Sequence, residues 1–135
     1  MSGKSDYLEL KILDHLLGGA TYSQPATVYV ALCLAVPTDT GISSEVSVGD
    51  YTRLAVGNTS SDGSWSAASS GQKKNAKEFS YKQATANWGT VQGFAIMDAV
   101  TAGNLLYWGS LDTQKSISTG DTAKFALDDI VISED

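Results

Sequence analysis

Apolar residues near the start of the chain repeat with the spacing of an α-helix. Leu8, Ile12 and Leu16 lie four residues apart, and Leu13 and Leu17 lie beside them. One face of this segment is therefore apolar, which predicts an amphipathic helix over about residues 6–17.

Capping signals flank this predicted helix. Ser5 or Asp6 can act as the N-cap, and Asp6 and Glu9 place carboxylates at the positive end of the helix dipole. Gly18 and Gly19 can end the helix as a C-cap. Because three turns of helix are marginal alone, the apolar stripe must lie on the rest of this domain or on a neighbouring subunit.

After Pro25 the pattern changes to the period of two that is typical of strands. Residues 27–34 place alternate apolar side chains on one face: Val28, Val30, Leu32 and Leu34. Further strands are expected at residues 51–56, 77–81, 91–98, 105–110, 124–127 and 130–132, with another beginning at residue 117. Residues 38–49 and 58–75 are predicted to be loops.

This order of elements predicts a mainly β fold. We expect seven to nine short strands in an antiparallel β-sandwich or jelly-roll-like domain, with one N-terminal α-helix. The β-sandwich is expected over about residues 26–133, and residues 1–135 are expected to form a single domain.

Composition narrows the function classes. The chain has 135 residues, a net charge of −6, one His and one Cys. A chain this acidic has no overall attraction for a phosphate backbone, so we expect no nucleic-acid partner. We also expect no membrane partner or export signal, because charged residues interrupt the first twenty positions and residues 28–36 form the longest apolar run.

Catalytic and metal-binding motifs are not expected in this sequence. His15 is interpreted as stabilising the C-terminal end of the helix, and Cys33 as a buried, inert thiol. Asp128 and Asp129 are adjacent, so in a strand they would point to opposite faces. The other acids are interpreted as solvated turn or strand-end residues: Asp39, Glu45, Asp62, Asp98 and Asp112. We therefore expect no catalytic, cofactor-binding or metal-binding residues.

A basic cluster interrupts the acidic trend. Lys73, Lys74 and Lys77, with Lys82 further along, alternate with aromatic residues. Three interpretations stay open: a lysine patch for nucleic acid, a solvated strand edge that discourages stray sheet pairing, and a contact for an acidic partner. The solvated edge is favoured.

Tryptophans are the more informative aromatic residues. Trp108 lies in a predicted strand and is expected in the core, and Trp88 stands where a strand begins. Trp65 lies in a loop of small residues and has no evident core to enter. It is interpreted as an interface residue or a lid on the domain, with sugar stacking as the alternative.

Several segments together resemble a known class of protein. They are residues 5–19, residues 25–32 with Pro37-Thr38-Asp39, and residues 87–98 with Gly103-Asn104-Leu105-Leu106-Tyr107-Trp108-Gly109. In these segments the chain resembles small virion proteins of tailed bacteriophages that are commonly labelled tail fibre proteins. The likeness implies a role in the particle and carries no active site.

Physical size qualifies that resemblance. A compact domain of this length has a radius of gyration of about 14 Å, and the sequence has no shaft-forming repeat. We therefore expect a knob or adaptor on the tail, or a decoration protein on the capsid, located in the virion after synthesis in the host cytoplasm. The expected interface residues are Leu8, Ile12, Leu16, Trp65, Lys73, Lys74 and Lys77.

Three functional hypotheses follow. The favoured one is a non-enzymatic structural protein that packs as a homo-oligomer, with a trimer as one candidate, and contacts other virion proteins. The alternative is a carbohydrate-binding module that recognises host surface glycans through Trp65, Trp88 or an exposed Tyr. The third is a small hydrolase with paired acids, for which no substrate suggests itself.

Overall fold

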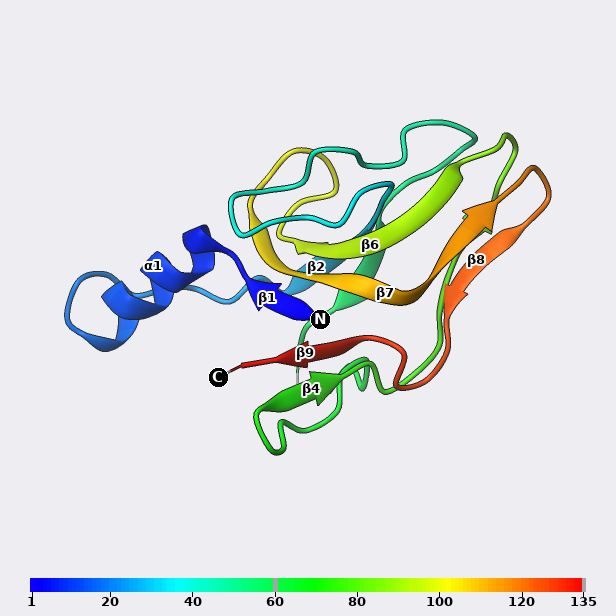
Figure 1. Ribbon diagram of the computed structural model, residues 1–135. Coiled ribbons are helices and arrows are strands. Elements are labelled where there is room, and N and C mark those ends of the chain that lie inside the picture. The colour runs from blue at the N-terminus through cyan, green and yellow to red at the C-terminus, as the bar shows by residue number, and fades with distance from the viewer. Residues whose placement is uncertain (60, 135) are drawn as a thin grey trace.

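A computed structural model describes residues 1–59 and 61–134 of the chain. Within these residues it contains one helix and nine strands (Figure 1). In chain order they are β1 (Ser2–Lys4), α1 (Asp6–Leu16), β2 (Thr27–Cys33), β3 (Leu54–Gly57), β4 (Gln72–Lys74), β5 (Phe79–Gln83), β6 (Gly89–Met97), β7 (Leu105–Ile117), β8 (Thr122–Phe125) and β9 (Val131–Ser133).

The strands form one large and two small antiparallel sheets. The large sheet has the order β1-β7-β6-β2-β3, and β4 pairs with β9 while β5 pairs with β8. Figure 1 shows β4, β9 and β8 below and beside the large sheet, which gives a sandwich-like arrangement. The predicted mainly β, antiparallel fold with a single N-terminal helix is confirmed.

The main hydrophobic core lies between these layers. β2 contributes Val28, Val30 and Leu32, the alternating face that the sequence predicts. The small sheets contribute Phe79 from β5 and Phe125 from β8, among others. The opposite side of the large sheet has a smaller cluster of its own, formed by Ala31, Cys33, Ala95, Met97, Leu105 and Trp108.

The helix begins and ends where the capping signals predict. The Ser5 hydroxyl accepts a hydrogen bond from the Leu8 amide at 3.1 Å, as an N-cap does. Gly18 takes a left-handed backbone with φ of 91°, and the Gly19 amide donates to the Asp14 carbonyl at 2.8 Å. This is the geometry of a helix closed by a glycine.

Three strands differ from the sequence-based expectation. β1 was not expected, and it pairs with β7 through Ser2 and Gly109. β4 lies within a segment that the sequence predicts to be a loop. β7 is one strand of 13 residues instead of two separate arms, because its exposed second half pairs with the start of β6. The prediction of a single domain over residues 1–135 stays a prediction.

Candidate functional site

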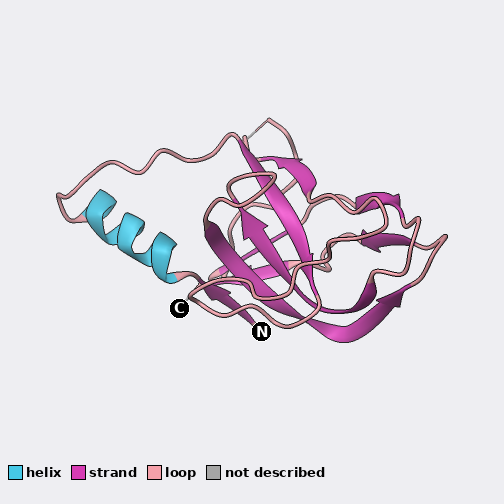
Figure 2. Ribbon diagram, turned by 90° about the horizontal axis from the view of Figure 1, so that it is seen from above, coloured by secondary structure: helices cyan, strands magenta, loops and turns pink. Residues whose placement is uncertain are grey.

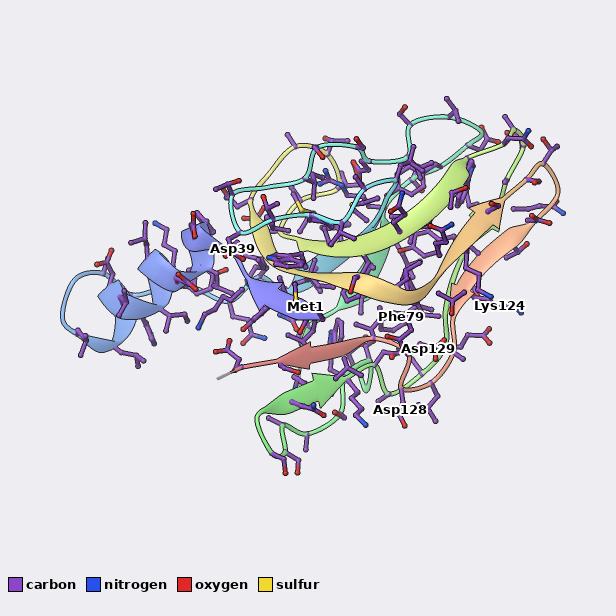
Figure 3. All side chains as sticks on the ribbon, viewed as in Figure 1. Met1, Asp39, Phe79, Lys124, Asp128 and Asp129 are labelled. Carbon is purple, nitrogen blue, oxygen red and sulfur yellow. The ribbon has the colours of Figure 1, made fainter. Side chains whose placement is uncertain are left out.

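The helix is attached to the body of the protein at one end only. At its root the Ser5 amide donates to the Leu106 carbonyl at 2.9 Å, and the Ser5 hydroxyl donates to the Leu105 carbonyl. The Asp6 amide also donates to the Asp39 carbonyl at 3.0 Å, and Figure 3 shows Asp39 near the junction between helix and sheet. Beyond this root the helix projects outward, and a long loop returns to β2 (Figure 2).

Burial therefore falls along the predicted apolar stripe. Leu8 is 4% exposed and fills the chain's own core, so it leaves little surface for a neighbour. Ile12 is half-buried against that core, and Leu16 is 70% exposed. The helix thus packs on its own domain through its first turns, and the interface role expected for the stripe is available only toward its far end.

Four leucines are exposed on this helix and at its end. Leu10, Leu13, Leu16 and Leu17 are 64%, 54%, 70% and 80% exposed. Contiguous exposed apolar surface on a soluble protein marks a contact site more often than isolated apolar residues do. We call these four residues the leucine tip.

Trp65 lies partly buried over the main core. Its ring meets Phe79 edge to face, with 5.5 Å between ring centroids. Its indole Nε1 is buried and has no hydrogen-bond acceptor among the described residues. The structure therefore places Trp65 as a lid on the domain, one of the two roles favoured by the sequence, and its role in an interface stays a prediction.

An apolar pocket opens beside Trp65. Its volume is about 340 Å³, and its apolar walls come from Val28, Ile96, Leu106 and Ile132 on four different strands. Trp65 and several polar or small residues also line it: Asn58, Ala68, Gln72, Lys73, Tyr107 and Glu134. Pockets of about 300–1,000 Å³ are the usual size for bound ligand groups. We call this feature the Trp65 pocket.

Lysines lie on one side of this pocket. Lys73 is exposed on β4 and lines the pocket, and its ammonium donates to the Ser66 carbonyl at 2.7 Å. Lys74 is half-buried on the same strand. Lys77 is exposed and lies 3.6 Å from the Asp62 carboxylate. The structure therefore brings Trp65 and Lys73 together at one pocket, while Lys77 lies in a separate ion pair.

A hydrogen-bonded trio lies at the other side of the pocket. The Tyr107 hydroxyl and the Lys4 ammonium donate to different oxygens of Glu134, at 2.6 and 2.9 Å. Burial raises the pKa of Glu134, but the bonds from Tyr107 and Lys4 and the charge of Lys4 outweigh it, so the net pKa lies below the usual value. Lys4 therefore compensates the Glu134 charge, and Lys73 is the cation at the pocket without a carboxylate partner among the described residues.

Two of the acids interpreted as solvated turn or strand-end residues have hydrogen-bond partners in the structure. Glu45 accepts from Arg53 Nε at 2.7 Å and Nη2 at 3.1 Å, and Arg53 is buried. Asp39 accepts from the Trp108 indole at 2.8 Å. The expectation was wrong for Glu45, which is half-buried against the buried Arg53. Asp39 is exposed in a turn, as expected, and binds Trp108 from there. Asp112, also expected in a turn or at a strand end, lies within β7.

The adjacent acids do not form a strand pair. Asp128 and Asp129 lie in the connection between β8 and β9 (Figure 3), where Asp128 has a φ of 67° and Asp129 accepts from the Ala126 amide at 2.9 Å. His15 Nδ1 accepts from the Tyr22 amide at 3.1 Å at the end of the helix. No group of three or more potential metal ligands occurs in residues 1–59 and 61–134.

The other two tryptophans and the single cysteine lie in the protein interior. Trp88 and Trp108 are buried, and each indole N–H has an acceptor, the Gly49 carbonyl for Trp88. Burial of Trp88 removes it as a sugar-stacking surface. Cys33 is buried, and burial raises the pKa of its thiol to about 12, which keeps the thiol protonated and unreactive at neutral pH.

Sequence reasoning missed the pocket as a unit. Its walls come from β2, β6, β7 and β9, which lie far apart in the sequence, so no spacing signal could have found it.

The described part of the chain has no helix long and apolar enough to cross a membrane.

Comparison with known proteins places the chain in a family. No curated protein matches it. A family model described as "Podophage GP4 fiber I protein gp80" matches residues 3–133, which includes the helix, the leucine tip and strands β2 to β9 in full. Because the match covers nearly the entire chain, this protein belongs to the family of the podophage GP4 fiber I protein, a family of phage fibre structural proteins.

Proposed function

We propose that this chain is a non-enzymatic structural component of a tailed-phage virion, located on the particle surface. It acts by packing with further copies of itself and by attaching to neighbouring virion proteins. The observation that carries the proposal is the family match over residues 3–133. The word fibre in the family's description favours a tail fibre or adaptor over a capsid decoration protein.

Two structural features support attachment as the mode of action. The β body is held together by long-range pairing, such as that of β1 with β7, which suits a stiff building block. The helix projects from that body (Figure 2). The leucine tip that it carries has four exposed apolar side chains. On a symmetric particle, many such modest contacts sum to firm attachment.

Glycan recognition, the alternative function, has weaker support. Trp65 lines a pocket with polar neighbours, as sugar sites require, but Asn58, Tyr107 and Glu134 among them already bond within the chain. The Asn58 amide donates to the Pro25 carbonyl at 3.1 Å, and both Glu134 oxygens accept bonds within the chain. The pocket walls are mainly aliphatic, whereas sugar hydroxyls need several free polar partners.

The proposed function is tested on purified particles of the phage that encodes this chain. Quantitative mass spectrometry of gradient-purified virions is expected to detect the chain in a fixed number of copies per particle. Detection only in the unassembled fraction of the lysate would refute the proposal. A glycan array probed with the parent protein and Trp65→Ala tests the alternative, for which binding lost in the variant is required.

A further inference from the structure

We propose that the leucine tip of one copy docks into the Trp65 pocket of a second copy of this chain. The inference deepens the proposed function and rests on it, because it names the contact by which copies pack. It joins two apolar features of the described surface: a projecting group of leucines and a hollow of about 340 Å³.

The tip cannot reach the pocket of its own chain. The helix root is held by hydrogen bonds from Ser5 to Leu105 and Leu106 on β7, and Leu106 is itself a wall of the pocket. From this root the helix extends away from the sheets, as two views show (Figures 1 and 2). Leu16 and Leu17 therefore lie at the far end, and a second molecule must supply the pocket that they enter.

Many apolar groups could enter an apolar pocket, but the charge around the leucine tip favours this helix as the occupant. Glu9 and Asp14 lie on the helix surface near the exposed leucines, and the helix C-terminus carries the negative end of its dipole. The carbonyls of His15 and Leu16 accept no hydrogen bond from the described residues. The tip thus presents negative charge and free acceptors around its apolar side chains.

The pocket presents the complementary charge. Lys73 lines it and has donors left after its bond to the Ser66 carbonyl, since an ammonium has three. Lys74 follows on the same strand, and Lys4 compensates the charge of Glu134. In a chain with a net charge of −6, a cation beside an apolar pocket matches an acidic apolar helix end.

The contact is head-to-tail, because a different surface of each molecule takes part. A docked pair still has one free tip and one free pocket, so a further copy can add at either end. Such a contact closes into a ring or continues as an open chain, according to the rotation between copies. It also differs from a helix bundle, in which leucine tips would pack on one another.

Complementary variants test this contact. Leu16→Glu with Leu17→Glu disables the tip, and Ala68→Trp, at an exposed residue that lines the pocket, fills the pocket. Leu127→Glu is the matched control, because Leu127 is a leucine exposed elsewhere, in the β8–β9 connection. Circular dichroism and urea midpoints confirm that each variant is folded.

Sedimentation velocity across a concentration series gives the result. The parent and the Leu127→Glu control are expected to associate alike, and both disabled variants are expected to associate at least about tenfold more weakly. An equal mixture of the two disabled variants is expected to form only a dimer, from the one intact tip and the one intact pocket. Lys73→Glu is expected to weaken association, and adding Asp14→Lys to restore it.

Three outcomes would overturn the inference. A parent that stays monomeric at every concentration would mean that a different virion protein occupies the pocket. Undiminished association of Ala68→Trp would indicate packing of helix on helix. Undiminished association of the tip variant would place the contact elsewhere. None of these outcomes bears on the virion location of the chain, which particle mass spectrometry tests independently.

Discussion

Replacing Asn75 is expected to destabilise the layer that carries the lysines and one wall of the Trp65 pocket. Asn75 is 0% exposed and its side chain bonds to three backbone groups. Its Nδ2 donates to the Lys77 carbonyl at 2.9 Å and the Ala126 carbonyl at 2.8 Å. Its Oδ1 accepts from the Ile130 amide at 2.8 Å. This one side chain therefore ties the end of β4 to the connection that leads into β9.

The magnitude follows from which of these groups can reach water after Asn75→Ala. The Ile130 amide is in the interior, and leaving a buried donor unpaired costs about 1–3 kcal/mol. The Lys77 and Ala126 carbonyls belong to exposed residues, so each costs only the net value of a hydrogen bond, about 0.5–1.5 kcal/mol. The expected loss in the free energy of unfolding is about 2–6 kcal/mol.

Urea unfolding followed by tryptophan fluorescence measures this loss. With a slope of about 2 kcal/mol per molar, the midpoint should fall by about 1–3 M. Asn104→Ala is the matched control, because Asn104 is exposed and, among the described residues, its side-chain amide bonds only to Asp98. The control should stay within about 0.5 kcal/mol of the parent. A loss below about 1 kcal/mol for Asn75→Ala would refute the reasoning.

Three further predictions concern the interior of the protein. Arg53→Ala should lower the free energy of unfolding by about 2–4 kcal/mol, as measured in urea. This is less than the ~3–5 kcal/mol of a fully buried pair, because Glu45 keeps 23% of its side chain exposed. An unchanged urea midpoint would contradict this. Cys33 should resist thiol reagents at neutral pH until denaturant is added, because burial raises its pKa to about 12; rapid labelling of the native protein would disprove its burial. Burial raises the pKa of Tyr51 and Tyr81 above the usual 10.0, so their contribution to stability is full below pH 10 and is lost as the pH rises beyond it. Unfolding measured at a series of pH values should show this alkaline loss, and constant stability above pH 10 would argue against it.

The parts of the fold that could be predicted from sequence are those with local signals. The helix was predictable from its leucine spacing and from Ser5 and Gly18 at its ends. β2 was predictable because Val28 and its alternating neighbours share one buried face. These signals arise within one element, so they need no knowledge of what packs against it.

The parts that could not be predicted depend on partners distant in sequence. β1 has three residues and exists because it pairs with β7 more than a hundred positions away. The second half of β7 is exposed on both faces, so it lacks the alternation by which a strand is recognised. Glu45 is only eight positions from its partner Arg53, but the folded loop is needed to bring the two side chains into contact.

The candidate site combines both kinds of information. The apolar helix face was predictable, but its division into a buried Leu8 and an exposed Leu16 depends on where the helix leaves the sheet. Trp65 was predictable as an unusual residue, yet its pocket exists only once strands from both layers meet. We therefore propose an interface of a tip and a pocket in place of the continuous stripe that the sequence predicts.

The central claim is that this chain works as a stiff, repeated unit whose exposed surface binds its neighbours in the particle. A virion reconstruction in which the chain is resolved tests it most directly. The account predicts several symmetry-related copies with the β body unchanged and the leucine tip buried against another protein chain. Copies whose leucine tips all stand free in solvent, or a particle that lacks the chain, would contradict it.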